Sequence, residues 1–178
     1  HNIYVPANCS PFVTDLDNSR RYGTLTDFEN LVKLTHTSQN LDMCSNILVE
    51  PTDVRQEHRP AKTIYACLRL SDKCFMGSAI DAEGAHQTLR MLSMVFGEKE
   101  ALVQKPRVIA IPCSLTPLCY DEYMLGVMIE YAQAGQPQLI NSLTIAGATA
   151  PATLAGALVV QNAEILAGIV FTQLVREG

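Results

Sequence analysis

The sequence predicts an α/β fold in which helices pack on a parallel sheet, and three observations support this. Short apolar runs typical of buried strands alternate five times with longer segments of helical periodicity. Strands that alternate with helices form parallel sheets, because each helix returns the chain to the same end of the sheet. The 178 residues are 48% hydrophobic, and no linker or low-complexity segment interrupts them, so residues 1–178 are expected to form a single domain.

Ten elements are expected from the apolar periodicity and the turn residues between the periodic segments. Runs of four to eight apolar residues favour strands, and longer amphipathic runs favour helices. The expected elements are, in order, strand 2–5, helix 24–40, strand 43–50, helix 60–70, strand 74–79, helix 81–96, strand 107–114, helix 121–135, strand 138–145 and helix 152–175. Both an open doubly wound sheet and most of a (β/α)8 barrel fit this order.

Capping residues indicate where several helices begin and end. Thr26 and Glu29 have the spacing of a capping box at the start of the first helix. Asp81 is expected as the N-cap of the third helix, which should end before Gly97. Gly135 ends the fourth helix in the same way, because glycine readily adopts the left-handed conformation that follows many helices.

The last helix lies in an almost wholly small and apolar stretch, so a membrane span is the first alternative to weigh. The uncharged run from Leu143 to Val160 reaches the lower length limit of a spanning helix. However, Glu164 follows directly, and no basic cluster flanks the run to set an orientation. We therefore expect no membrane. Instead, Thr149 should cap a helix with Pro151 near its start, and this helix should be buried on several sides.

Composition excludes other classes of partner and site. The net charge is −5 and no basic patch occurs, so nucleic acid is not an expected partner. The six cysteines include no CxxC pair, and in a long, core-rich chain they are interpreted as reduced thiols of a cytoplasmic protein. No phosphate-binding loop, dinucleotide-binding, zinc-protease or serine-hydrolase motif is present, and we expect no metal site.

The loop "IPCSLTPLCYDEY" follows the strongest predicted strand and carries candidate binding residues. In parallel α/β folds the chemistry lies at the carboxyl ends of the strands, which is where Ser114 is expected. The ring of Tyr120 and the carboxylate of Glu122 suit a cationic ligand. The alternative is that Asp121 and Glu122 only favour the start of a helix.

The loop "NSLTIAGATAP" follows the last predicted strand. Ser142 lies within that strand and needs a polar partner if it is buried, while Gly147 and Thr149 leave room for a ligand near the backbone. The alternative is a tight turn without a ligand. In the following helix, Glu164, with Gln161 and Asn162 beside it, interrupts the apolar face, which indicates either an internal polar network or a site.

An acidic pair occurs in the first loop, "NCSPFVTDLDNSRRYGT". Asp15 and Asp17 follow an expected strand, and two neighbouring carboxylates are able to bind a cation or a metal. Surface turn chemistry is the preferred interpretation, because aspartate commonly accepts hydrogen bonds from the backbone two residues further on.

Three stretches resemble the trimethylamine:corrinoid methyltransferase family. "SLTIAGATAPATLAGALVVQNAEILAGIVFTQLVREG" is similar to a family block that contains GATGP, TLAG, QNAE and QLV. "FVTDLDNSRRYGTLTDFENLVKLTHTSQNLDMCSNILVEPTD" and "IPCSLTPLCYDEY" resemble two earlier blocks more loosely. Ala150 stands where the family has glycine, and Cys113 and Thr116 alter the family's strand-end pattern.

The resemblance implies a (β/α)8 TIM barrel, of which about five βα units are present here as an incomplete part. It implies methyl transfer from a methylated amine, either trimethylamine or a quaternary amine such as glycine betaine, to the Co(I) of a corrinoid. That corrinoid (a cobalamin) is carried by a partner protein, so no tightly bound cofactor is expected, and a homo-oligomer is. Some members use pyrrolysine, at a position downstream of this sequence. The residues expected to line the mouth and contact the amine are Ser114, Tyr120, Glu122, Ser142, Gly147 and Thr149.

Two alternatives remain open at this point. A different barrel enzyme, such as a lyase on a carboxylated or phosphorylated substrate, needs a cationic side chain at a strand end. Lys73 and Arg107 are instead expected at strand starts, which argues against it. The other alternative is a non-catalytic packing or oligomerisation fragment, which would assemble through unpaired sheet edges.

Overall fold

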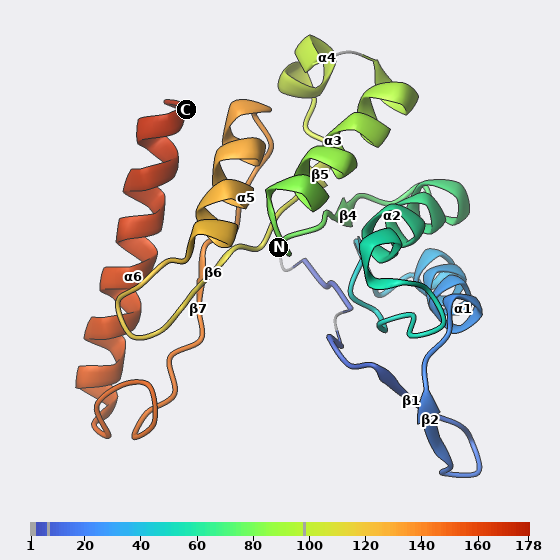
Figure 1. The fold of residues 1–178 in the computed structure, drawn as a ribbon, viewed down its shortest axis with the longest axis horizontal. Helices are drawn as coiled ribbons and strands as arrows, with labels where there is room; N and C mark the ends of the chain where they lie inside the picture. The colour runs from blue at the N-terminus through green and yellow to red at the C-terminus, as the bar shows by residue number, and fades with distance from the viewer. Residues whose placement is uncertain (1–2, 7, 98) are drawn as a thin grey trace.

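The computed structural model describes residues 3–6, 8–97 and 99–178 and has a mixed α/β fold (Figure 1). The helices are α1 Leu25–Thr37, α2 Arg59–Leu70, α3 Ala82–Phe96, α4 Lys99–Gln104, α5 Glu122–Gln133 and α6 Leu154–Val175, with a 3-10 turn at Gln56–His58. The strands are β1 Phe12–Thr14, β2 Arg20–Tyr22, β3 Cys44–Ser45, β4 Phe75–Met76, β5 Val108–Ile109, β6 Cys113–Ser114 and β7 Asn141–Ser142.

The strands from β3 onward pair in parallel and in sequence order. β3, β4 and β5 form one sheet, in which Cys44, Phe75 and Val108 lie in register. β6 pairs with β7, and a parallel bridge between Ala110 and Gln138 precedes that pair. The predicted strand 107–114 therefore pairs with β4 through its first half and with β7 through its second half. The prediction of a parallel sheet is confirmed, although the ladders are shorter than expected.

The helices contact one another in the same succession as the strands pair. α1 packs on α2, α2 on α3, α3 on α5 and α5 on α6. Figure 1 shows these helices side by side along one face of the parallel strands.

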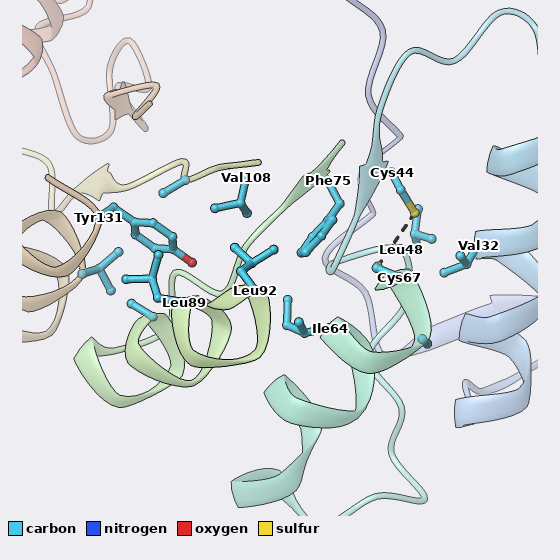
Figure 2. Close-up of a cluster of buried hydrophobic side chains, with 14 of the residues drawn as sticks. Val32, Cys44, Leu48, Ile64, Cys67, Phe75, Leu89, Leu92, Val108 and Tyr131 are labelled. Carbon is cyan, nitrogen blue, oxygen red and sulfur yellow. Dashed lines mark hydrogen bonds between the residues drawn. The ribbon is translucent and has the colours of Figure 1, made fainter. Parts of the chain in front are cut away.

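The hydrophobic core lies between the strands and α1, α2, α3 and α5. Figure 2 shows its central residues, among them Val32, Ile64, Leu89, Leu92 and Tyr131 from the helices and Cys44, Phe75 and Val108 from the strands. The sulfur atoms of Cys44 and Cys67 lie 3.9 Å apart within it. All six cysteines are free thiols, as predicted.

Lys73 ties the end of α1 to the start of β4. Its ammonium group donates to the backbone oxygens of Thr35, Ser38 and Leu41 at 2.7, 2.6 and 2.6 Å. A helix end leaves carbonyl groups without intrahelical partners and carries partial negative charge, so a cation is well placed there.

The N-terminal region differs from the prediction in two places. Ile3–Val5 lie in no strand, and the backbone of Tyr4 bonds to Asp42 instead. The Tyr4 N–H donates to the Asp42 carboxylate at 2.8 Å, and the Asp42 N–H donates to the Tyr4 carbonyl oxygen at 2.9 Å. Asn2 lies outside the described residues. The expected first loop instead contains an antiparallel hairpin of β1 and β2, in which Phe12 pairs with Tyr22 and their ring centroids are 4.8 Å apart.

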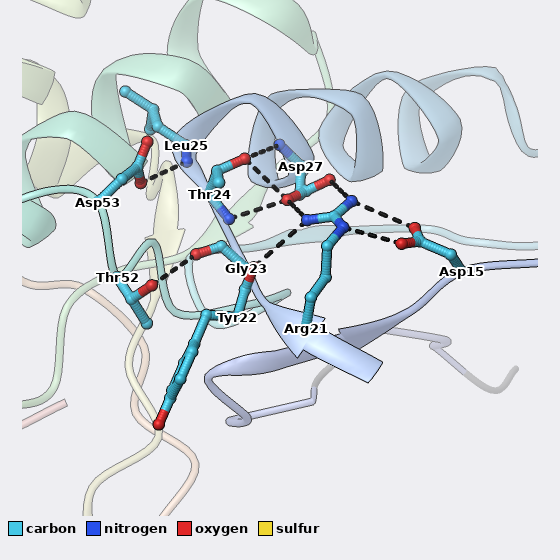
Figure 3. Close-up of polar contacts among 9 residues, drawn as sticks. All are labelled: Asp15, Arg21, Tyr22, Gly23, Thr24, Leu25, Asp27, Thr52 and Asp53. Carbon is cyan, nitrogen blue, oxygen red and sulfur yellow. Dashed lines mark hydrogen bonds and ion pairs between the residues drawn. The ribbon is translucent and has the colours of Figure 1, made fainter. Parts of the chain in front are cut away.

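The capping box of α1 lies two residues earlier than predicted, at Thr24 and Asp27 (Figure 3). Arg21 explains the difference, because its guanidinium bonds to Asp27 at 2.7 Å and to Asp15 at 2.8 Å. The bonds from Arg21 and then from Thr24 hold the pKa of Asp27 well below its usual range. Asp17 accepts from the backbone of Ser19 at 3.0 Å. Turn and ion-pair chemistry therefore accounts for both Asp15 and Asp17.

The predictions for α6 are partly wrong. Its N-cap is Thr153, and only Ala157, Glu164 and Gly168 are buried, so the expectation of burial on several sides fails. Within the described residues its main contacts are with α5, β6 and β7, and most of its apolar side chains are exposed. By length and composition alone, the helix would be able to cross a membrane.

Candidate functional site

The candidate site lies where β6 and β7 end side by side. Ser114 and Ser142 are in register at the carboxyl ends of these strands, and both are buried. The loops that carry the other predicted residues leave the sheet from this point.

Both serines donate to Glu164, which reaches them from the inner side of α6. Its Oε2 atom accepts from Ser114 at 2.5 Å, from Ser142 at 2.6 Å and from Thr116 at 2.9 Å. Its Oε1 atom accepts from the backbone N–H of Leu118 at 2.7 Å. Glu164 is only 2% exposed, so four donors from two strand ends surround a carboxylate that water scarcely reaches.

These bonds keep Glu164 ionised in spite of its burial. Burial by itself raises the pKa of a carboxyl group. Here the hydrogen bonds from Ser114, Ser142, Leu118 and Thr116 outweigh burial and lower the pKa of Glu164 to about 2. The group is therefore a fixed negative charge at neutral pH, and it has no proton to donate in acid catalysis.

Tyr120 packs α6 against the strands. Its hydroxyl donates to the backbone oxygen of Glu164 at 2.9 Å. Gly168 makes this approach possible, because a Cβ atom there would lie 2.5 Å from the Tyr120 hydroxyl and 2.7 Å from Ile140. Burial, then the charge of Glu164 and then Cys113 raise the pKa of Tyr120, so the phenol is neutral.

The other three predicted residues lie in the surrounding loops. Glu122 is exposed at the first position of α5, where Asp121 caps the helix by accepting from Met124 at 2.7 Å. Asp121 and Glu122 thus lie at the start of α5, where negative charge is favourable, and the cation contact of Glu122 stays a prediction. Gly147 is exposed at φ 80°, and Thr149 accepts from Ile145 at 2.9 Å to close a turn.

The structure thus brings Ser114, Ser142 and Tyr120 together around Glu164. Sequence analysis had identified Glu164 as a buried polar group that needs partners, but it did not connect it to Thr116 or to the Leu118 backbone. The signal that connects them is the hydroxyl group on every second residue, at 114 and 116 and again at 142 and 144, because alternate side chains of a strand share a face. Within the described residues, no cluster of three or more His, Cys, Asp and Glu side chains is arranged to hold a metal ion.

Comparison with known proteins identifies related sequences along the whole chain. Residues 1–178 match the family model described as trimethylamine methyltransferase (MTTB). A glycine betaine methyltransferase from Desulfitobacterium hafniense (strain Y51) is 43% identical over 99% of this chain and 37% of its own length. A proline betaine:corrinoid methyltransferase from Eubacterium limosum is 28% identical over 91% of this chain and 35% of its own length.

A further match covers a shorter part of the chain. A trimethylamine methyltransferase from Methanosarcina thermophila is 37% identical over 46% of this chain and 17% of its own length. The chain thus spans 37% and 35% of the lengths of the two relatives that it matches along most of its residues.

Proposed function

The chain belongs to the trimethylamine methyltransferase family, and from this premise we propose that the whole protein transfers a methyl group from a quaternary amine to a corrinoid protein. The observation that carries the proposal is the 43% identity, over 99% of this chain, to a protein named glycine betaine methyltransferase. The proposed methyl acceptor is the Co(I) corrinoid of a separate protein, in keeping with the relative named proline betaine:corrinoid methyltransferase.

We propose that the described residues form part of a (β/α)8 barrel. In a doubly wound sheet the strand order reverses and helices cover both faces. Here the strands from β3 to β7 pair in sequence order, and the successive helices pack on one another. This singly wound arrangement is the one that curls into a barrel. Since the chain spans 37% of its 43% identical relative, the remaining βα units have room elsewhere in the whole protein.

The proposed reaction requires little acid–base chemistry from the protein. A quaternary nitrogen is already positive, so it leaves as a neutral amine and keeps the electron pair of the broken N–C bond. The methyl carbon bonds to Co(I), which supplies both electrons of the new bond, and no proton moves. The corrinoid therefore contributes the nucleophile, and the protein contributes binding and orientation of the cation.

The residues predicted to line the mouth divide into two groups in this proposal. Glu122, Gly147 and Thr149 lie in or next to loops that follow strand ends, where an amine would enter a barrel. The carboxylate of Glu122 adds a negative charge that attracts a cationic substrate. Ser114 and Ser142 are 4% and 6% exposed and bonded to Glu164, so we assign them to holding the strand ends in place. We assign the same role to Tyr120, whose hydroxyl donates to the backbone oxygen of Glu164.

The test uses the whole protein with cob(I)alamin under anaerobic conditions and a panel of methylated amines. The panel is glycine betaine, proline betaine, carnitine and trimethylamine, with no-amine and heat-denatured protein as controls. Loss of the Co(I) absorbance with formation of methylcobalamin for a quaternary amine supports the proposal. No methylation with any amine, in an assay where a known methyltransferase is active, would refute it. Light scattering on the same preparation tests whether the protein is a homo-oligomer.

A further inference from the structure

One face of the strand run 108–114 lies against the helices. Burial alternates along it, since Val108, Ala110, Pro112 and Ser114 are buried and Ile109, Ile111 and Cys113 are half-buried. Val108 and Ala110 belong to the core shared with the helices, and Ser114 reaches Glu164 on α6. Because alternate side chains point to opposite faces, Cys113 points away from the helices.

The neighbouring run 138–142 shows the same alternation. The side chain of Gln138 donates to the backbone of Met128 in α5 at 2.9 Å, and Ile140 lies against Gly168 in α6. Ser142 continues this series by donating to Glu164. Asn141 therefore points to the opposite face.

Cys113 and Asn141 meet on that opposite face. They are in register, and the side-chain amide of Asn141 donates to the Cys113 sulfur at 3.6 Å. Leu139 and Leu143, the residues two before and two after Asn141, are 56% and 60% exposed. In a closed barrel this face is the interior, and Cys113, Asn141 and Leu143 lie at its carboxyl end, where barrel enzymes bind substrate.

We propose that Asn141 orients the substrate and that Cys113 and Leu143 form the wall beside it, one position along from the two serines of the Glu164 network. This inference rests on the proposed function and names the part of the amine that is recognised. A quaternary ammonium group offers no hydrogen-bond donor, so its methyl groups suit an apolar surface such as Leu143. A carboxylate needs donors, and the Asn141 amide supplies one that, among the described residues, is bonded only to a weakly accepting sulfur. The chemistry favours a betaine, which carries both groups.

The first arm of the test measures steady-state kinetics of the whole protein. Asn141→Ala removes one hydrogen bond to a carboxylate, which corresponds to about a 10- to 100-fold rise in KM for glycine betaine. The same variant should leave KM for tetramethylammonium, which has no carboxylate, within about 2-fold. Asn162→Ala, at an exposed position on α6, is the matched control for an asparagine substitution. Asn141→Asp keeps the size but repels the carboxylate, so it should weaken betaine use further.

The second arm needs no variant and no turnover. N-ethylmaleimide labelling of the wild-type protein is followed at Cys113 by peptide mass spectrometry, with and without saturating glycine betaine. Binding should slow labelling of Cys113, whereas labelling of the exposed Cys74, at the opposite end of the strands, should not change.

The outcomes separate this inference from the proposed function. A selective rise in KM together with protection of Cys113 supports both. In another outcome the wild type transfers methyl groups, the folded Asn141→Ala variant has an unchanged KM, and Cys113 is not protected. This result overturns the inference and leaves the proposed function standing. An inactive wild type that also shows no protection overturns both. Circular dichroism of each variant identifies a folding defect, in which case the labelling arm on the wild type decides.

Discussion

Replacing Glu164 by glutamine removes one buried charge while keeping the shape of the side chain. In the wild type, Oε2 accepts from Ser114, Thr116 and Ser142, and Oε1 accepts from the Leu118 backbone. Glutamine has one oxygen and one NH2 group. The oxygen can still accept from Leu118, but the NH2 group, with two hydrogens, then faces three hydroxyls that all donated before.

Two estimates of the stability lost on replacing Glu164 by glutamine agree. Exchanging charge-assisted hydrogen bonds for neutral ones costs about 1 kcal/mol for each bond, so four altered bonds that partly re-form cost about 2–4 kcal/mol. The pKa of Glu164 falls from an ordinary value of 4.5 to about 2 on folding. By linkage, this shift corresponds to about 3 kcal/mol of stability at neutral pH.

The sign of the pH dependence follows from the lowered pKa. The stabilisation is fully present above the unfolded pKa of 4.5 and is lost as the pH falls toward about 2. Urea unfolding of wild-type and Glu164→Gln protein should therefore differ by about 3 kcal/mol at pH 7, and the difference should shrink steadily below pH 4.5. Glu177→Gln, at an exposed position, is the control. A difference under about 0.5 kcal/mol at pH 7, or one that does not change on acidification, would refute the reasoning.

Three further predictions concern other contacts. Arg21→Ala should raise the pKa of Asp27 toward its ordinary value, measurable by NMR titration, and should cost less than about 1 kcal/mol because the ion pair is partly exposed. Gly168→Ala should destabilise the protein by about 1–3 kcal/mol in urea unfolding, because the new methyl group meets the Tyr120 hydroxyl. Lys73→Met should cost about 1–3 kcal/mol and speed amide hydrogen exchange in the last turn of α1, because three carbonyl oxygens lose their shared donor.

Each of these has a matched control on an exposed surface. The controls are Arg90→Ala for Arg21, Ala163→Ser for Gly168 in the same helix, and Lys33→Met for Lys73. All three positions are exposed, so each control should alter stability by less than about 0.5 kcal/mol. The Arg21 contact is contradicted if Asp27 titrates as in the wild type. The Gly168 contact is contradicted if the Gly168→Ala protein is as stable as its control, and the Lys73 contact if hydrogen exchange in α1 is unchanged.

The sequence predicted the order of the βα units well because apolar periodicity and caps are local signals. Asp81 caps α3 through a side-chain bond to Gly84, as its position before an apolar periodic segment indicated. Asp121 caps α5 through a bond to Met124, in keeping with the helix start that the sequence offered as one of two interpretations. The start of α1 was misplaced because Thr26 with Glu29 and Thr24 with Asp27 both have capping-box spacing. The β1–β2 hairpin places Arg21 beside Asp27, and this ion pair favours the box formed by Thr24 and Asp27.

The candidate site was less predictable because it depends on contacts between distant segments. Ser142 was expected to need a polar partner and Glu164 was expected to be buried, yet nothing local joins residue 142 to residue 164. The exposure of α6 was also missed, because an apolar composition indicates that a helix is suited to burial but not which segment covers it. Within the described residues, α5, β6 and β7 make the main contacts with this helix.

The one-residue offset between the serines and the Cys113–Asn141 pair has a consequence for how specificity evolves. Ser114 and Ser142 are the chain neighbours of Cys113 and Asn141 and point to the face opposite the proposed amine site, so a substitution at either serine is expected to move the backbone of that site. If the proposal holds, substrate preference can change through residues that the substrate does not contact. Introducing Asn141 alone into a relative should then change its substrate affinity little. Introducing both strand ends together with the residue equivalent to Glu164 should also reproduce the backbone position of Asn141.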